Sequence, residues 1–213
     1  MSRPAVFMDR DGTVSQEVGY VVHLDRYALL PRSVEAIRRI NEAGFAAIVA
    51  TNQSGVARGL FSEALVEQVH RRLQEWLADG GARLDGIYYC PHHPREGNGA
   101  FTGPCDCRKP RPGMLQRAAA EHGLDLSRSY MIGDTGRDLG AGAAAGATPV
   151  LVLTGYGRGE LEHLRHRWTA EPAFIAEDLL EAVTWILARH AERPAGADAP
   201  APRRGADPQG SAR

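Results

Sequence analysis

Two carboxylates that stand two residues apart, directly after an apolar run, are the residues of this sequence best suited to chemistry. Residues 4–8 read as a buried strand, and Asp9 and Asp11 follow it, with Gly12 next. In an open α/β sheet, ligands bind beyond the carboxyl ends of the strands. Two carboxylates this close repel each other unless a cation or a shared proton intervenes, which predicts magnesium and a division between nucleophile and acid/base. An Asp-rich turn is the alternative for this stretch alone.

Further polar residues cluster at the ends of other predicted elements. They are Thr51, Asn52, Gln53 and Ser54 after the second strand, Arg108 and Lys109 before a helix, and Asp134 and Asp138 after the fourth strand. Hydroxyl and amide groups are suited to phosphate, and two cations before a helix N-terminus are suited to an anion. Each group alone could be a turn or a solvated pair. Together they predict one phosphate site at one edge of a sheet.

A segment with three cysteines predicts a zinc site. Cys90 and His92 are followed, after twelve intervening residues, by Cys105 and Cys107. Four such ligands are the number that a closed, structural tetrahedral zinc site requires, and no position is left for water. His93 could replace His92 as a ligand. The alternative is three free cysteines in a loop, but the polar, glycine-containing segment between them has little apolar content to hold itself together.

The predicted elements alternate along the chain. Strands are predicted at residues 4–8, 45–50, 86–90, 130–133, 149–153 and 174–175, and helices at 33–43, 62–79, 112–123, 139–145 and 178–190, the first of them capped by Ser33. Alternating strands and helices predict an α/β fold with a doubly wound, mainly parallel sheet that is covered on both faces. We expect one domain at residues 1–190 and a disordered tail at 191–213, which lacks bulky apolar residues.

Composition narrows the function classes. The 213 residues carry a formal net charge of −1, so the basic excess typical of nucleic-acid-binding domains is missing, and we expect no nucleic-acid partner. No apolar run reaches the length of a membrane span and the N-terminus has no signal-peptide pattern, so we expect no membrane partner and a cytoplasmic location.

The motifs resemble those of the haloacid-dehalogenase (HAD) superfamily of phosphatases. Residues 9–13 (Asp-Arg-Asp-Gly-Thr) match its first motif, Thr51-Asn52 its second, Lys109 its third, and Gly133-Asp134 with Asp138 its fourth. Longer stretches, at 9–20, 51–59, 86–94 and 105–110, resemble the branch that removes the C7 phosphate from heptose 1,7-bisphosphates. The resemblance covers roughly residues 4–190. Thr135 departs from it, because well-known members carry a lysine thought to touch substrate there.

The resemblance implies a Rossmann-like core without a cap domain and a role for each motif residue. Asp9 would be the nucleophile that forms an aspartyl-phosphate, and Asp11 the general acid and base. Magnesium would be held by Asp9, by the Asp11 carbonyl and by Asp134. Lys109, Thr51 and Asn52 would bind phosphoryl oxygens, Asp138 would support the metal or Lys109, and Arg108 would hold a second phosphate or sugar hydroxyls. The loop of Glu17, Val18, Gly19 and Tyr20, the segment from Ser54 to Arg58 and the zinc loop would shape access for a small sugar phosphate. We expect the enzyme to be a monomer.

Three rival functions remain open at this point. A phospho-receiver signalling domain also places acids at the strand ends of a parallel sheet, but it needs no zinc loop. A zinc-stabilised nucleic-acid-binding module is disfavoured by the neutral charge balance. Histidinol-phosphate phosphatases resemble this chain in both the motifs and the zinc site, and they are the nearest enzymatic rival.

Overall fold

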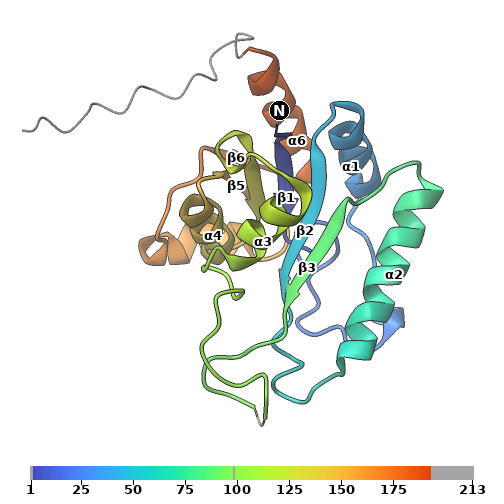
Figure 1. The fold of residues 1–213 in the computed structure, drawn as a ribbon, viewed down its shortest axis with the longest axis vertical. Helices are drawn as coiled ribbons and strands as arrows, with labels where there is room; N and C mark the ends of the chain where they lie inside the picture. Colours follow the sequence, from blue (N-terminus) through green and yellow to red (C-terminus); the bar gives the residue numbers. More distant parts are fainter. Residues whose placement is uncertain (1, 98, 193–213) are drawn as a thin grey trace, which may run out of the picture.

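A six-stranded parallel sheet forms the centre of the structure (Figure 1), a computed structural model that describes residues 2–97 and 99–192. The strands are β1 (Ala5–Met8), β2 (Ala46–Asn52), β3 (Gly86–Cys90), β4 (Tyr130–Gly133), β5 (Thr148–Val152) and β6 (Phe174–Ala176). They lie in the order β3-β2-β1-β4-β5-β6, and every neighbouring pair is parallel. The chain works outward from β1 in one direction and then returns to add β4 on the other side. The crevice between β1 and β4 is therefore the switch point at which such sheets bind ligands.

Helices cover both faces of the sheet. The longer ones are α1 (Ser33–Glu42), α2 (Glu63–Asp79), α3 (Gly113–His122), α4 (Gly136–Ala145) and α6 (Leu179–Ala191). Short helical turns lie at η1 (Leu24–Arg26), η2 (Leu126–Arg128), α5 (Gly157–Gly159), η3 (Glu160–Leu164) and η4 (Arg165–Arg167). Among the described residues, no helix is long and apolar enough to cross a membrane.

Side-chain alternation along β1 divides the apolar interior into two clusters. Val6 and Met8 join the cluster under α1, α2 and α6, while Ala5 and Phe7 join the cluster under α3. All four are fully buried. Successive side chains of a strand point to opposite faces, so a strand covered on both sides must be apolar throughout. This is why β1 reads as an uninterrupted apolar run and why its first polar side chain, Asp9, comes only at the open edge.

The predicted α/β architecture is confirmed, and the differences lie at the ends of elements. Strand β2, predicted at 45–50, extends to Asn52 and so includes Thr51 and Asn52. Ser33 does not cap α1: the N-cap is Arg32, whose backbone has φ 65°, and the Ser33 hydroxyl donates to the Val14 carbonyl at 2.8 Å. The helix predicted from residue 139 begins at Gly136, because Thr135 and Asp138 form a capping box. The helical turns between residues 157 and 167 were not anticipated. The predicted tail lies outside the described residues, apart from 191 and 192.

Candidate active site

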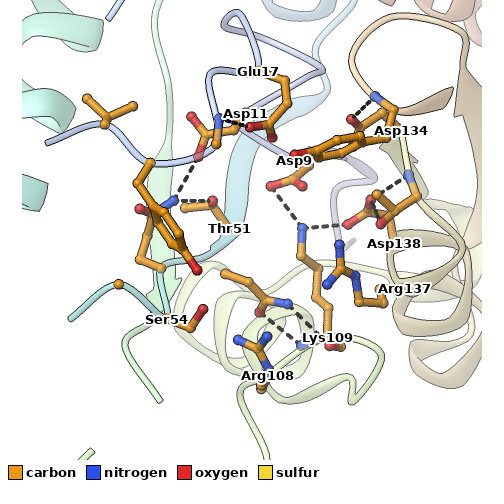
Figure 2. Close-up of a pocket in the computed structure, with 18 of the residues that line it drawn as sticks. Asp9, Asp11, Glu17, Thr51, Ser54, Arg108, Lys109, Asp134, Arg137 and Asp138 are labelled. Atoms are coloured by element: carbon orange, nitrogen blue, oxygen red, sulfur yellow. Dashed lines mark hydrogen bonds and ion pairs between the residues drawn. The ribbon is translucent and has the colours of Figure 1, made fainter. Parts of the chain in front are cut away.

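The predicted chemical residues meet in one pocket at the carboxyl ends of β1, β2 and β4, with about 840 Å³ of space that is open to solvent (Figure 2). Of the predicted catalytic, metal-binding and substrate-binding residues, those that line it are Asp9, Asp11, Glu17, Gly19, Tyr20, Thr51, Asn52, Gln53, Ser54, Arg108, Lys109, Asp134 and Asp138. Val18 does not line the pocket, because its side chain packs against the larger apolar cluster.

Lys109 is the cation at the pocket floor. Its Nζ lies 2.9 Å from Asp9 Oδ1 and 2.5 Å from Asp138 Oδ1, and its side chain is 1% exposed. Burial by itself lowers the pKa of a lysine, but the carboxylates of Asp138 and Asp9 outweigh it and raise the pKa of Lys109 above its ordinary value. Lys109 is therefore a fixed positive charge next to the predicted nucleophile.

Asn52 positions the backbone of Lys109. Its side-chain amide donates to the Lys109 carbonyl at 3.2 Å and accepts from the Lys109 N–H at 3.1 Å. Asn52 lines the pocket as predicted, and one N–H of its side-chain amide is not used by these two bonds. Thr51 is nearly fully buried, and its Oγ1 accepts from Gln53 Nε2 at 2.9 Å. The Thr51 hydroxyl proton remains available to an oxygen in the pocket.

Asp11 is held by three side chains. Arg10 forms a two-pronged contact with it, at 3.0 Å from Nε and 2.8 Å from Nη2, and Gln53 and Ser15 donate at 2.9 and 3.3 Å. Burial disfavours a charged Asp11, but the Arg10 guanidinium outweighs burial and holds the pKa of Asp11 below its ordinary value. Asp11 is therefore a fixed carboxylate whose position depends on Arg10.

Arg10 itself is 1% exposed, so protein atoms surround its side chain almost completely. Its Nη1 is 3.2 Å from His70 Nε2, and its guanidinium lies 5.6 Å from the centroid of the Tyr27 ring. Burial, followed by the Arg10 charge, lowers the pKa of His70 to about 3, so the imidazole is neutral and can accept from Arg10.

Asp134 approaches the chain closely at two glycines. A Cβ at Gly12 or Gly155 would lie 2.0 or 2.1 Å from Asp134 Oδ2, so only glycine leaves room for the carboxylate. The same oxygen accepts from the Tyr156 N–H at 2.8 Å. Asp9, Asp134 and Asp138 each have a carboxylate oxygen within 4.8 Å of the others. Of these, Asp138 is neutralised by Lys109, which leaves Asp9 and Asp134 to hold a metal.

The charges at the pocket floor fit a divalent cation. Four carboxylates (Asp9, Asp11, Asp134 and Asp138) face two buried cations (Arg10 and Lys109). Burial raises the pKa of Asp9 to about 6, although Lys109 opposes the shift. Burial, Asp138 and Asp9 raise the pKa of Asp134 well above its ordinary value. Both carboxylates are thus buried next to other acids, and oxygen ligands of this kind suit magnesium.

The Cys/His segment also forms one cluster. The sulfur of Cys105 lies 3.6 Å from that of Cys90 and 3.4 Å from that of Cys107, and His92 Nδ1 lies 3.7 Å from Cys90 and 3.5 Å from Cys107. Zn–S bonds of about 2.3 Å in a tetrahedron place ligand atoms about 3.8 Å apart, so these four atoms fit zinc.

His92 rather than His93 belongs to this cluster. His93 Nδ1 instead accepts from the Glu96 N–H at 2.7 Å, and its Nε2 lies 3.1 Å from Arg58. Arg108 Nη1 donates to the His92 carbonyl at 3.1 Å. This bond ties the rim arginine to the Cys/His cluster.

Loops from opposite sides form the rim. The ring centroids of Tyr20 and Phe61 are 6.2 Å apart. The Arg58 guanidinium lies over the Tyr20 ring, 5.9 Å from its centroid. Glu17 accepts from the Gly19 N–H, which folds the 17–20 loop over the pocket. Burial raises the pKa of Glu17 above its ordinary value. These contacts keep an acid and an aromatic ring at the mouth.

Four lining residues were missed by the sequence reasoning: Val21, Phe61, Arg137 and Tyr156. Tyr156 follows the end of β5, where the rule applied to the other strands would have found it. Arg137 stands between Asp134 and Asp138, and attention to the acids obscured it. Thr135, which departs from the resembled motif, also lines the pocket, but it is only 4% exposed and its hydroxyl donates to Asp138 at 2.6 Å.

Comparisons with known proteins agree with this geometry. Residues 106–182 match the family described as HAD-hydrolase-like. D-glycero-D-manno-heptose-1,7-bisphosphate 7-phosphatase of Thermosynechococcus vestitus is 46% identical over 91% of this chain and 100% of that protein. D-glycero-beta-D-manno-heptose-1,7-bisphosphate 7-phosphatase of Escherichia coli K12 is 47% identical over 72% of this chain and 81% of that protein.

A solved structure adds to the sequence relatives. D,D-heptose 1,7-bisphosphate phosphatase from B. bronchiseptica, complexed with magnesium and phosphate, has a TM-score of 0.77 and 38% identity, and the match covers 87% of this chain and 99% of that one. Identity at this level over nearly complete chains, together with the shared sheet, settles the relationship. The chain belongs to the family of heptose-1,7-bisphosphate 7-phosphatases, which are phosphatases of the HAD type.

Proposed function

We propose that this protein is a magnesium-dependent phosphatase that cleaves the C7 phosphate of D-glycero-D-manno-heptose 1,7-bisphosphate and leaves heptose 1-phosphate, a step toward nucleotide-activated heptose. The names of its relatives support the substrate. The observation that carries the reaction class is Asp9 within 2.9 Å of a buried lysine and beside a second acid, Asp134. A phospho-receiver function is the weaker candidate, because a receiver has no need of a substrate rim or a Cys/His cluster.

Asp9 and Asp11 would divide the chemistry between them. A carboxylate oxygen of Asp9 attacks phosphorus, an aspartyl-phosphate forms, and the bond from phosphorus to the C7 oxygen breaks. Asp11 gives its proton to the departing alkoxide and then takes a proton from the water that hydrolyses the aspartyl-phosphate, which releases phosphate and restores Asp9. Asp11 is ionised in the free enzyme, and we expect the negative charges of the substrate to raise its pKa when it must act as an acid.

The cationic and hydroxyl groups of the floor would bind the transferring phosphoryl group. Lys109 stays protonated and is aimed at the oxygens around Asp9, and the Thr51 hydroxyl can donate to another oxygen. Asn52 would act mainly by fixing Lys109. Magnesium would be held by Asp9, Asp134 and the Asp11 carbonyl, and when bound it would offset the repulsion between the Asp9 carboxylate and the phosphate.

Zinc would be held by Cys90, His92, Cys105 and Cys107 in a structural role, because four protein ligands close its coordination sphere. The Cys/His cluster connects directly to the active site, since Arg108 and Lys109 follow Cys107 in the chain. We infer that zinc fixes the loop from which both cations reach the pocket. A single domain, a monomeric state and a cytoplasmic location remain predictions.

Loops would have to provide the specificity. Glu17, Gly19 and Tyr20 would contact the sugar, with Gln53 and Ser54 on the neighbouring wall and Arg108 at the rim for an anion. Histidinol phosphate lacks a second phosphate, so the cation at the rim would be left unpaired. This argument favours the bisphosphate over the histidinol-phosphate alternative.

A phosphate-release screen tests the proposal. Purified protein with magnesium is assayed against both anomers of heptose 1,7-bisphosphate, heptose 7-phosphate, histidinol phosphate and an aryl phosphate. We expect the highest kcat/KM for one of the bisphosphate anomers. A higher kcat/KM for histidinol phosphate than for either anomer would overturn the substrate assignment, and no turnover of any ester would overturn the enzyme assignment.

A further inference from the structure

Arg137 is the one cation of the pocket rim to which the preceding sections give no role. It is the second residue of α4, it is exposed, and it lines the same pocket as the catalytic acids. Within residues 2–97 and 99–192, its guanidinium has no hydrogen bond and no ion pair. The charge is therefore presented to whatever enters the pocket.

The residues next to Arg137 are already committed to the protein itself. Thr135 donates its hydroxyl and its N–H to Asp138, at 2.6 and 3.0 Å, and the Gly136 N–H donates to Glu160 at 3.1 Å. Asp138 in turn pairs with Lys109. Among the described residues from Thr135 to Asp138, only Arg137 has a charged side chain that is not paired within the protein.

The location of Arg137 is tied to the reacting centre through the Lys109–Asp138 ion pair. Arg108 directly precedes Lys109, and Arg137 directly precedes Asp138. Because Lys109 Nζ and Asp138 Oδ1 are 2.5 Å apart, the two preceding arginines are brought to one side of the pocket. Figure 2 shows both guanidinium groups beside Lys109, across the pocket from Asp11 and Glu17.

The two arginines are near enough to repel each other. Both guanidinium groups line the same pocket on the side of Lys109, and both carry a positive charge. Arg137 also stands in the first turn of α4, where the helix dipole disfavours a cation. Neither feature stabilises the free protein. An anion with two negative charges between the guanidinium groups would attract both of them and remove their mutual repulsion.

We propose that Arg137 determines specificity together with Arg108, by holding the phosphate of the substrate that is not cleaved. The inference rests on the proposed function, because it requires a substrate with two phosphates. The anion would sit at the rim on the cationic side, while Glu17 and Tyr20 face the sugar from the opposite side. Arg137 would bind substrate without touching the transferring phosphoryl group, so its loss should act mainly on KM.

The test compares a bisphosphate with a monophosphate. The kcat/KM values for heptose 1,7-bisphosphate and heptose 7-phosphate are measured in the wild type, Arg137→Ala, Arg137→Lys and Arg83→Ala. Arg83 is an exposed arginine just before β3, at the opposite edge of the sheet, and its variant controls for the loss of one positive charge. For Arg137→Ala, we expect the bisphosphate-to-monophosphate ratio of kcat/KM to fall about tenfold, through KM, since an exposed charged contact is partly screened.

The Arg137→Lys variant and added salt test whether the effect depends on the charge and the shape of the guanidinium group. Arg137→Lys keeps the charge but loses the planar fork, so its ratio should lie between those of the wild type and Arg137→Ala. Added salt should lower the ratio of the wild type more than that of Arg137→Ala. If the wild type prefers the bisphosphate and Arg137→Ala keeps the same bisphosphate-to-monophosphate ratio, the role of Arg137 is overturned but the proposed function is not. A wild type that hydrolyses aryl phosphate but not the bisphosphate overturns the proposed function instead.

Discussion

Replacement of Lys109 by methionine tests whether the buried ion pairs are central to both the fold and the catalysis. Methionine has nearly the length of lysine and no charge, so the variant removes the ammonium with little change in packing. Two carboxylates, Asp9 and Asp138, would lose a partner at 2.9 and 2.5 Å. Neither can be fully rehydrated, because their side chains are 14% and 1% exposed.

The expected loss of stability is large. Breaking a buried ion pair by removing one partner costs about 3–5 kcal/mol, because the remaining charge is left without compensation. For a domain of this size, each kcal/mol shifts Tm by about 2–4 °C, so Tm should fall by about 10 °C. Turnover should fall by a factor on the order of 10²–10³, the effect of removing one donor that stabilises transition-state charge.

The assay is urea unfolding followed by circular dichroism, with magnesium removed, alongside aryl phosphate turnover with magnesium present. Asp138→Asn and the double variant with Lys109→Met provide the matched comparison. Because the double variant removes both partners, it should regain part of the stability that Lys109→Met loses. A free energy of unfolding for Lys109→Met within about 1 kcal/mol of the wild type would refute the reasoning, since the ammonium would then not be compensating these carboxylates.

Three further predictions concern the catalytic carboxylates, the magnesium site and the zinc site. Asp9→Asn should abolish turnover with the fold intact by circular dichroism, and Asp11→Asn should reduce it on the order of 10²-fold; substantial activity in Asp9→Asn would refute the nucleophile assignment. Magnesium affinity should rise from about pH 5.5 to about pH 7.5, because the pKa of Asp9, about 6, and the raised pKa of Asp134 let protons compete with the metal in acid; calorimetry showing a pH-independent affinity would contradict this. Wild-type protein purified without chelator should carry about one zinc per chain, and Cys105→Ser should lose it and lower turnover; metal analysis without zinc would refute the site.

Most of the sheet could be predicted because strands that are buried on both faces appear in the sequence as continuous apolar runs. Strands β1 and β2 are apolar along nearly their whole length, and each meets its first polar group where the sheet ends. The same rule predicts that Asp9, Thr51 and Asp134 meet at one edge of the sheet, and all three line the pocket there. The carboxyl ends of parallel strands lie along the same edge of the sheet. Residues that follow different strands in the sequence are therefore brought together in one site.

Other features depend on contacts between distant residues and leave no local pattern. Nothing in the local sequence marks Arg10 as buried, but α2 brings His70, 60 positions along the chain, against it. Ser33 looked like a helix cap, but its hydroxyl is taken by Val14. Arg137 received no role from the sequence, and the Lys109–Asp138 ion pair places it on the same side of the pocket as Arg108. In each case a tertiary partner outweighs the local preference.

The Lys109 environment also determines how the protein reacts with amine-directed reagents. Lys109 is the only lysine in the sequence, since every other strongly basic side chain is an arginine. Its ammonium is buried and kept protonated by two carboxylates, so it is a poor nucleophile in the folded state. Acylation at this position requires the ammonium to leave its ion pairs with Asp9 and Asp138 and to lose its proton. The rate at which a single acyl group appears on Lys109 therefore reports how often these ion pairs open, with no engineered probe.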